Sequence, residues 1–327
     1  MWGSAIGCIV TLILSLLIAP LTAEAQPGEK MPRLGVLTPG IPPQPWLEAF
    51  RQELRTLGYV EGQTIALEVR WDEHHPERWP ALAADLVRLR VDLIVAGTTV
   101  AAQAAKQVTS TLPIVMAGSS DPVGDGLVAS LARPGGNITG LSIMTPELTG
   151  KRLELLREVV PGLARVALLL DARSPRRHLR LQEHDAAARV LGVQLQPLEV
   201  RGPEEYAGAF QAALQGQAQA LIIPTSPLFG AHRAQLAELA LASRLPTMAG
   251  NPGYAHAGGL MDYGANQIET WQRAATYVDK ILHGATPADV PVEQPTKFML
   301  VLNRKTAQAL GITFPPTLLI LADEVIQ

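Results

Sequence analysis

Hydroxyl-bearing and charged residues follow the apolar runs of this sequence at several places. The clearest case is VMAGSSDPVGDGL, residues 115–127, where an apolar run leads directly into Ser119, Ser120 and Asp121. A loop of this kind could cradle a phosphate group, expose a nucleophilic serine, or form one side of a ligand clamp. The neighbouring residues discriminate between these three kinds of site.

A dinucleotide-binding turn fits the stretch poorly. Gly124, Gly126 and Ala129 satisfy the pattern G-x-G-x-x-A, and Glu147 follows about twenty residues later, where an acid that binds ribose is expected. These glycines come several residues after the expected strand, whereas a dinucleotide turn begins at the strand end itself. A P-loop motif, G-x-x-x-x-G-K-[ST], is absent from the sequence.

A serine nucleophile and a metal centre are also poorly supported. A nucleophile elbow needs G-x-S-x-G, but Pro122 stands where the second glycine would be. The histidines further along the chain fall mostly on helical patterns, where a solvated or packed histidine is the usual case: His178, His184, His232, His256 and His283. The stretch WDEHHPERW, residues 71–79, lacks any spacing that puts metal ligands on one face, so we predict a solvated loop before a helix.

The segments around these loops have the periodicity of an α/β protein. Short β-rich apolar runs alternate with segments such as WLEAFRQELRTLGY, in which apolar residues recur every three or four positions. The expected strands are RLGVLTPG, TIALEVRW, VDLIVAGTT, LPIVMAGSS, RVALLLDARS, VQLQPLEV, QALIIPTSP and LPTMAGNP. This alternation predicts parallel sheets with helices on both faces.

The eight expected strands divide into two matching sets of four. RLGVLT at 33 matches RVALLL at 165, ALEV at 66 matches PLEV at 197, LIVAGTT at 93 matches LIIPTSP at 221, and LPIVMAG at 112 matches LPTMAGN at 245. The separations are 132, 131, 128 and 133 residues, so the register is kept along the chain. We therefore predict two similar doubly wound, Rossmann-like lobes and not one long sheet.

More elements follow the second set. The sequence predicts a strand at 259–263, a helix that ends near Gly284, a proline-rich connection, a strand at 298–302 and a short helix. These elements indicate that the chain crosses between the lobes more than once. Two lobes joined by several segments form a hinge, and a ligand would bind in the cleft between them.

Ligands of doubly wound sheets bind at the carboxyl ends of the strands. The predicted ligand-binding residues at these ends are Thr38, Thr98, Thr99, Ser119, Ser120, Asp121, Arg173, Ser174, Thr225, Ser226 and Asn251. Hydroxyl groups beside helix N-termini suit a carboxylate, Arg173 could add a bidentate contact, and Asp121 or Asp171 could meet an ammonium group. The alternative is that Thr98, Thr99 and Asp121 only cap helices.

Composition narrows the class of partner. The net charge is −3, the pI is near 6.2, and no dense run of Lys or Arg occurs, which disfavours nucleic acid as a partner. Aromatic residues make up only 5% of the chain, which weakens any argument for stacked bases or sugars. A hydrophobic fraction of 47% over 327 residues is ample for the core of one large or two ordinary domains.

The first 25 residues are expected to be a secretory signal peptide. An apolar run ends in small residues and the cleavage pattern Ala23-Glu24-Ala25, so we predict cleavage after Ala25. Pro20 and Thr22 interrupt the run before it reaches the roughly 18 to 20 apolar residues of a membrane anchor, although the usual basic residues at the start are missing. Cleavage would remove Cys8, the single cysteine of the sequence. The mature chain could then have no disulfide, no catalytic thiol and no zinc bound by cysteine.

Several long stretches carry a family likeness. They are DPVGDGLVASLARPGGNITGLS, TPELTGKRLELLREVVPG, GGLMDYG, RAATYVDKILHGATPADVPVEQPTKFMLVLNRKTAQALGI and PPTLLILADEVIQ. From about residue 31 to the end, the sequence resembles the tryptophan-type substrate-binding proteins of bacterial ABC transporters. The resemblance implies a type I periplasmic binding fold with three crossover segments and no catalysis. We expect residues 33–143 and 258–296 to form the N-terminal lobe, and 144–257 and 297–327 the C-terminal lobe.

The resemblance also implies which residues line the cleft. Carried over by position, they are Thr98, Thr99, Ser119, Ser120, Asp121, Thr225, Ser226 and Asn251, with Tyr263 after the return crossover. Two stretches depart from the family pattern, TPGIPPQPW and PTSPLFG. Because both lie where specificity would be decided, an aromatic ligand is not implied.

These inferences predict a periplasmic, monomeric solute-binding protein without cofactor or metal. It would bind an amino acid or a related carboxylate and deliver it to an ABC permease, with its ATPase subunit, in the inner membrane. The alternatives are an enzyme on a similar two-lobe frame, such as a racemase or an NAD-using protein, and the sensor module of a receptor or repressor. A helix-turn-helix pattern and a second membrane span, which a sensor would need, are not found in the sequence.

Overall fold

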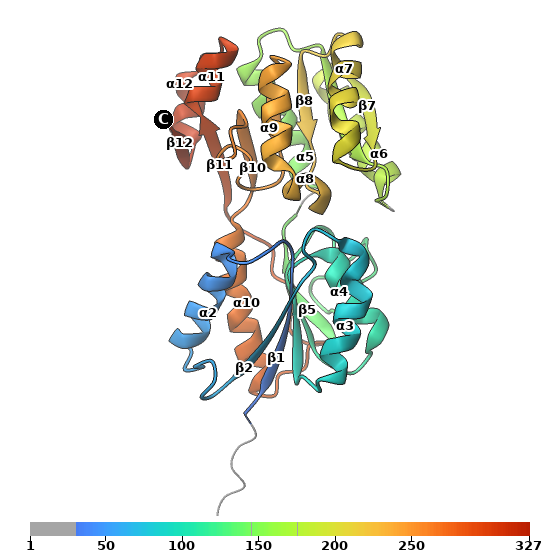
Figure 1. Cartoon of the computed structure of the whole chain (residues 1–327), viewed down its shortest axis with the longest axis vertical. Helices are drawn as coiled ribbons and strands as arrows, with labels where there is room; N and C mark the ends of the chain where they lie inside the picture. Colours follow the sequence, from blue (N-terminus) through green and yellow to red (C-terminus); the bar gives the residue numbers. More distant parts are fainter. Residues whose placement is uncertain (1–30, 145, 175) are drawn as a thin grey trace, which may run out of the picture. The chain divides into compact units, whose positions relative to one another are not determined.

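The computed structural model describes residues 31–144, 146–174 and 176–327. Contacts group Pro32–Gln327 into one unit, which holds two β-sheets (Figure 1). We call the five-stranded sheet with its helices the first lobe, and the seven-stranded sheet with its helices the second lobe. The expected signal peptide, residues 1–25, lies outside the described residues. Within those ranges, no helix is long and apolar enough to cross a membrane.

The strands of the first lobe are all parallel and follow the order β2-β1-β3-β4-β5. They are β1 (Arg33–Thr38), β2 (Ala66–Trp71), β3 (Leu93–Ala96), β4 (Ile114–Ser119) and β5 (Ile138–Ser142). The first four coincide with strands expected from the sequence, but β5 was not expected. Its sequence, ITGLS, carries a central glycine, which weakens a strand signal, and only pairing with β4 and full burial reveal it.

Helices cover both faces of the first sheet, as buried parallel strands require. They are α2 (Pro45–Thr56), α3 (Trp79–Arg88), α4 (Thr99–Val108) and α10 (Gln267–Leu282), with the single 3-10 turn η1 (Pro76–Arg78) before α3. On one face α2 packs against α10, where Phe50 meets Trp271 edge to face at 5.8 Å between ring centroids. On the other face Trp79 and the alanines of α4 pack over Leu37.

The second lobe has the strand order β12-β11-β10-β9-β8-β6-β7, in which only the pair β10 and β11 is antiparallel. Its strands are β6 (Arg165–Asp171), β7 (Gln194–Val200), β8 (Ala220–Ile223), β9 (Thr247–Ala249), β10 (Met261–Ala265), β11 (Phe298–Asn303) and β12 (Glu324–Ile326). The last of these, β12, was not expected from the sequence. It is three residues long and half exposed, so it has almost no periodicity to detect.

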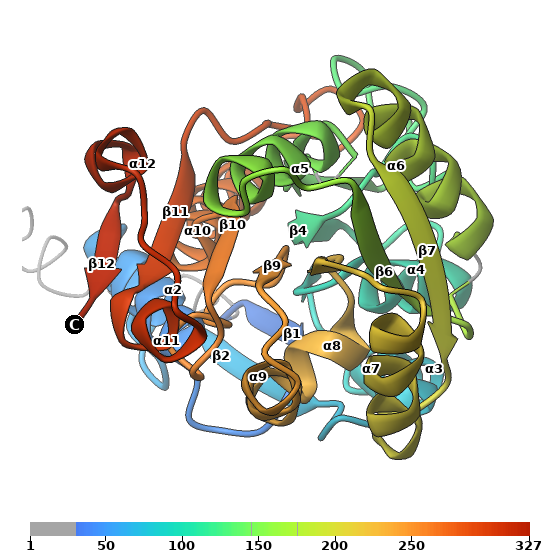
Figure 2. The ribbon, with the colours of Figure 1, turned by 90° about the horizontal axis from the view of Figure 1, so that it is seen from above.

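Two helical layers also enclose the second sheet. Its helices are α5 (Leu148–Val159), α6 (Arg177–Leu191), α7 (Tyr206–Gln215), α8 (Pro227–Ala231), α9 (Arg233–Ala242), α11 (Arg304–Leu310) and α12 (Pro316–Leu321), with the 3-10 turn η2 (Pro203–Glu205). One core joins α5, α6, α11 and α12 to the sheet, and the other joins α7, α8 and α9 (Figure 2). Each sheet is therefore buried on both faces.

The two lobes share one topology. The order β7-β6-β8-β9-β10 repeats the order β2-β1-β3-β4-β5, which confirms the prediction of two similar doubly wound lobes. The register differs from the sequence match in two strands. Arg33 pairs with Ala66 and Arg165 with Gln194, so Gln194 and not Pro197 is the counterpart of Ala66. Leu34 pairs with Leu93 and Val166 with Ala220, so Ala220 and not Leu221 is the counterpart of Leu93.

The chain passes between the lobes at three places. It leaves the first sheet after β5 and enters α5, it leaves β10 for α10, and it returns from the connection after α10 to β11. Strand pairing keeps β10 in the second sheet, although we expected residues 258–296 to belong to the first lobe. The reason is that β10 extends the sheet from β9, and only the following helix, α10, packs in the first lobe.

Candidate functional site

The first-lobe residues expected at the site come together around one hydroxyl. The Oγ1 atom of Thr99 lies 3.2 Å from the Oγ of Ser119 and accepts a hydrogen bond of 3.0 Å from the backbone N–H of Ser120. Thr99 begins α4, and Ser119 ends β4, so the contact joins two neighbouring carboxyl ends of the sheet. Ser119 is fully buried and the other two residues are partly buried, so the three form a hydrogen-bonded polar cluster at this edge of the sheet.

Two other predicted residues of the first lobe have structural partners. Thr98 is the N-cap of α4, since its side chain accepts a hydrogen bond of 3.1 Å from the N–H of Ala101. Thr38, at the end of β1, is fully buried, and its hydroxyl accepts a hydrogen bond of 3.3 Å from the indole N–H of Trp46. Both positions shape the edge of the sheet around Thr99.

Asp121 forms an ion pair with the second lobe. Its Oδ2 accepts a hydrogen bond of 2.8 Å from Arg176, and its Oδ1 accepts one of 2.9 Å from the N–H of Gly124. Arg176 also donates at 2.7 Å to Asp125, whose side chain is only 3% exposed. One guanidinium from the start of α6 thus binds two carboxylates of the loop after β4.

Neither Asp125 nor Arg176 was identified from the sequence. The sequence predicts Arg173 as the cation that contacts the ligand from this loop. In the structure its side chain is 49% exposed, and its Nε lies 3.8 Å from Oδ1 of Asp171 in the same loop. Ser174 accepts a hydrogen bond of 3.3 Å from the N–H of Arg176 and so helps to turn the chain into α6. The segment DARSPRR contains three arginines, and their spacing does not indicate which one faces the other lobe.

Burial governs the electrostatics of this ion pair. It raises the pKa of the Asp125 carboxyl, although the hydrogen bond from Arg176 acts in the opposite direction. Burial alone would lower the pKa of Arg176, but the hydrogen bonds with Asp125 and Asp121 raise it overall. Nearby on α6, burial also raises the pKa of Glu183. The cluster is held in a partly desolvated environment, where losing one partner is costly.

The strand ends of the second lobe are connected through Ser226. Its hydroxyl caps α8 and donates a hydrogen bond of 3.2 Å to Oδ2 of Asp171, at the end of β6. The N–H of Ser226 donates to Oδ1 of Asn251 at 3.0 Å, which brings in the loop after β9. The backbone N–H of Arg173 donates to Oδ1 of Asp171. Three carboxyl ends therefore meet at Ser226.

Thr225 and Tyr263 surround a residue that the sequence did not indicate. The hydroxyl of Thr225 donates to the carbonyl of Gly250 at 3.1 Å. The carbonyl of Tyr263 accepts a hydrogen bond of 2.8 Å from Nε of Arg152, a buried residue of α5. The ring of Tyr263 packs against Phe298 and the core of the second lobe.

The structure gives no support to the other chemistries weighed from the sequence. No helix follows Gly124 and Gly126, because residues 121–134 form only turns before β5, so a dinucleotide turn is not formed. Among the described residues, no group of three or more His, Cys, Asp and Glu side chains could hold a metal ion. In WDEHHPERW, His75 instead forms an exposed ion pair of 3.0 Å with Glu77.

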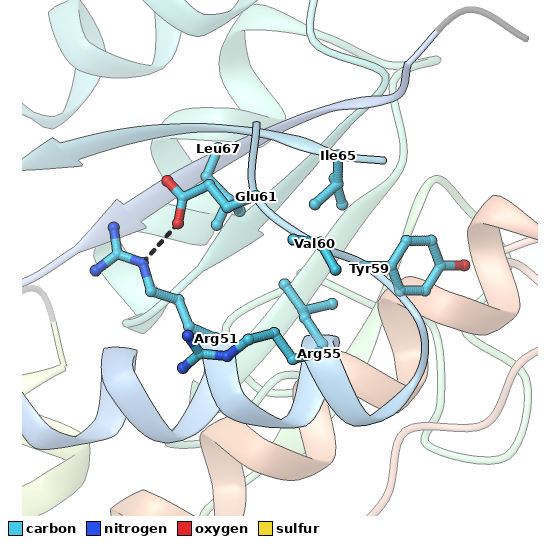
Figure 3. A pocket seen from close by; sticks show the side chains of 8 residues that line it. Arg51, Arg55, Tyr59, Val60, Glu61, Ile65 and Leu67 are labelled. Carbon is cyan, nitrogen blue, oxygen red and sulfur yellow. Dashed lines mark hydrogen bonds and ion pairs between the residues drawn. The ribbon is translucent and has the colours of Figure 1, made fainter. Parts of the chain in front are cut away.

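A small pocket elsewhere on the first lobe lacks these polar features. It has a volume of about 100 Å³ and lies between α2 and the segment that leads into β2 (Figure 3). Its lining residues are Arg51, Leu54, Arg55, Tyr59, Val60, Glu61, Ile65 and Leu67. The pocket borders the start of β2 and not the carboxyl ends, where ligands of this fold bind.

Two doubly wound lobes with the same strand order, joined by three crossings, define a type I periplasmic binding fold. Residues 46–326 match the model of the family described as ABC transporter substrate binding proteins, so the chain belongs to this family. The match confirms the resemblance seen in the sequence.

Individual relatives agree with this assignment. A tyrosine-binding protein from Clostridioides difficile (strain R20291) is 25% identical over 265 residues, which cover 81% of this chain and 76% of that protein. An ABC domain from Streptococcus pneumonia in complex with L-Trp is 26% identical with a TM-score of 0.83, covering 91% of this chain and all of that one. A leucine-binding protein from Thermotoga maritima MSB8 shares the fold at 15% identity, with a TM-score of 0.55 over 79% of this chain and 78% of that one. The first and the third are named as binding proteins, and the second is described with a bound amino acid.

Proposed function

We propose that this protein is the solute-binding component of an ABC importer and that it binds an amino acid between its two lobes. The observation that carries the proposal is the pair of strand-end clusters, around Thr99 and around Ser226, in lobes that Arg176 joins. Strand ends of doubly wound sheets are the usual place for a ligand. Relatives that are described with L-Trp or named for tyrosine make these two amino acids the first candidates.

The proposed contacts follow from the polar groups at these ends. Thr99, Ser119 and Ser120 would hydrogen-bond the solute from the first lobe, and Asp121 or Asp171 would meet its ammonium group. The remaining proposed ligand-binding residues are Thr38, Thr98, Arg173, Ser174, Thr225, Ser226, Asn251 and Tyr263. Binding and closure of the lobes would be the whole chemistry, without a cofactor.

The proposal extends to the partners and the compartment. The protein would be exported with cleavage after Ala25, act as a periplasmic monomer, and deliver its solute to a permease with an associated ATPase subunit. Membership in the family of ABC transporter substrate-binding proteins supports this role. Turnover of a bound amino acid, or binding of a nicotinamide cofactor by the purified protein, would instead favour an enzyme.

Two measurements test the binding role. Mass spectrometry of the small molecules that co-purify with the protein identifies candidate solutes, and L-tryptophan and L-tyrosine serve as defined probes. A solute that binds with Kd near 1 μM, added at 100 times Kd, should stabilise the protein by about 2.7 kcal/mol without being converted. Absence of a melting-temperature increase with every natural amino acid and with every co-purified molecule would contradict the proposal.

The site is tested by substitution and calorimetry. Thr99→Val removes the hydroxyl shared by Ser119 and Ser120 while it keeps the shape, and Asp121→Asn removes one carboxylate charge. Each should weaken solute binding by about tenfold, the loss of one good hydrogen bond or charge contact. Thr56→Val, at an exposed threonine near the end of α2, is the matched control and should leave Kd unchanged. If neither site variant weakens binding even threefold, the proposed clamp is wrong.

A further inference from the structure

Arg152 is a buried cation that forms no ion pair with a carboxylate among the described residues, although the charge of Asp262 favours its charged form. It lies on α5, its side chain is among the large fully buried ones, and its relative exposure is 2%. Its Nε donates to the carbonyl of Tyr263, but its Nη1 has no hydrogen-bond partner in the described part of the chain. Burial lowers its pKa to about 10, so it is still charged at neutral pH. A buried charge whose hydrogen bonds are incomplete is costly.

The guanidinium of Arg152 lies beside the predicted site. A Cβ atom placed on Gly250 would lie 3.0 Å from Cζ of Arg152, and one placed on Gly264 would lie 3.7 Å from its Nη2. Gly250 directly follows β9, and its carbonyl accepts the hydrogen bond from Thr225. Arg152 thus reaches from α5 to the carboxyl ends of β9 and β10, and the glycine at position 250 leaves room for this approach.

A second arginine reinforces the positive charge. Arg180, on the neighbouring helix α6 (Figure 2), also has an Nη1 without a partner in the described residues. The charges of Arg180 and Arg152 disfavour each other. Within the described ranges neither guanidinium forms an ion pair, although the charges of Glu183, Asp125 and Asp171 favour the charged form of Arg180. The charges of Arg180 and Arg152 both act on His184. This histidine adds no charge of its own, because burial lowers its pKa to about 4 and leaves it neutral.

We propose that Arg152, with Arg180 beside it, forms the subsite that binds the carboxylate of the solute. The inference rests on the proposed function and deepens it, because it assigns the carboxylate to the second lobe. The hydroxyls around Thr99 then bind other polar groups of the solute. A carboxylate would accept hydrogen bonds from the unpartnered Nη1 atoms, and a charge-assisted hydrogen bond to a guanidinium is the strong form of this interaction.

The competing role for Arg152 is that of a strut that fastens α5 to β10 through Tyr263. The two roles predict opposite effects of Arg152→Met. If Arg152 is an anion-binding residue, the variant removes a buried charge with incomplete hydrogen bonds, and the ligand-free protein melts at or above the temperature of the wild type. If Arg152 is only a strut, the variant melts several degrees lower and solute affinity is unchanged.

The direct test compares L-tryptophan with L-tryptophanamide, which keeps the ammonium group and the ring but lacks the carboxylate. By calorimetry, the wild type should bind the acid at least about tenfold more tightly than the amide. In Arg152→Met this ratio should fall below about threefold, because the acid loses affinity and the amide does not. Arg152→Lys should keep an intermediate ratio. Arg157→Met, an exposed position on the same helix that donates to the carbonyl of Leu191, is the matched control and should keep the wild-type ratio.

The outcomes separate this inference from the proposed function. A wild type that binds the acid and the amide equally, or an Arg152→Met variant that keeps the full ratio, overturns the subsite. A wild type that binds no natural amino acid overturns the proposed function instead. In that case the ligand-free melting temperature of Arg152→Met decides the role of Arg152, since a fall of several degrees would establish the strut.

Discussion

The two lobes have the same strand order but carry different chemistry at their carboxyl ends. The first lobe presents hydroxyls, with Thr99, Ser119 and Ser120 in mutual contact. The second lobe has ionic groups at these ends. They are Asp171, which accepts a hydrogen bond from Ser226, and the buried Arg152, which lies next to Gly250. A shared topology therefore fixes where a ligand can bind, and side chains that differ between the copies fix what each side can offer it.

The fifth strand shows the same divergence in the core. Gly140 pairs with Met116 on β4, and the corresponding position of the second sheet is Asp262, which pairs with Ala249. Gly140 has a φ of +125° and lies against the backbone of Met116, whereas Asp262 is a carboxylate with 3% exposure. One position thus requires the absence of a side chain, and its counterpart holds a charged one.

The largest effect is expected at Gly140. A methyl group in Gly140→Ala would collide with the carbonyl oxygen and the nitrogen of Met116, and the positive φ disfavours any L-residue. We expect the free energy of unfolding to fall by about 4 kcal/mol or the protein to fail to fold. Urea denaturation measures the change. Gly150→Ala, in α5 with open space around its Cα, is the control and should not destabilise. Equal stability of both variants would contradict the geometry of β5.

The next effect concerns the ion pair that joins the lobes. Arg176→Met leaves Asp121 and the buried Asp125 without their guanidinium, so the free energy of unfolding should fall by about 3 kcal/mol at pH 8. The loss should be smaller at pH 5, because burial already raises the pKa of Asp125 and the variant can bind a proton there.

Denaturation curves at the two pH values measure this difference. Arg189→Met, which removes an exposed ion pair with Asp185 on the same helix, is the matched control and should cost at most about 0.5 kcal/mol. A result for Arg176→Met within that range at both pH values would mean that the contact between the lobes adds nothing to stability.

The smallest effect has the opposite sign and lies at Asp262. Burial raises the pKa of its carboxyl to about 6, so the folded protein holds a proton more tightly than the unfolded chain. Its contribution to stability is present at low pH and is lost as the pH rises through 6. Asp262→Asn, which can still accept the hydrogen bond from Ala255, should therefore raise the free energy of unfolding by about 1 to 2 kcal/mol at pH 8 and by almost nothing at pH 4. A difference that does not change with pH would contradict the raised pKa.

Much of this fold could be predicted from local pattern. The eight strands of the two repeats, and the two strands and two helices that follow them, were expected because short apolar runs bounded by turn residues have a period that can be read directly. The strands that were missed lack this signal. β5 contains Gly140, and β12 is too short, so both are specified by their neighbours and not by their own residues.

The candidate site was predictable in position but not in detail. The rule that ligands bind after the strands of doubly wound sheets led to the loops of Thr99 and Ser226 as candidates, and the structure brings each loop into contact with neighbouring strand ends. The rule does not identify Arg152 or Arg176, because Arg152 lies within α5 and Arg176 lies just after the loop that was considered. Their roles depend on which way a long side chain turns, and no spacing along the chain encodes that.

The sequence by itself therefore determined the α/β class, the duplication and the family likeness, since each rests on residue patterns repeated over many positions. The tertiary structure decided which arginine joins the lobes, that Arg152 is buried with its Nη1 unpartnered, and that β10 belongs to the second sheet. The physical reason is that periodicity reports the burial of local elements. Charge pairing and strand pairing depend on groups far apart in the chain that meet only after folding.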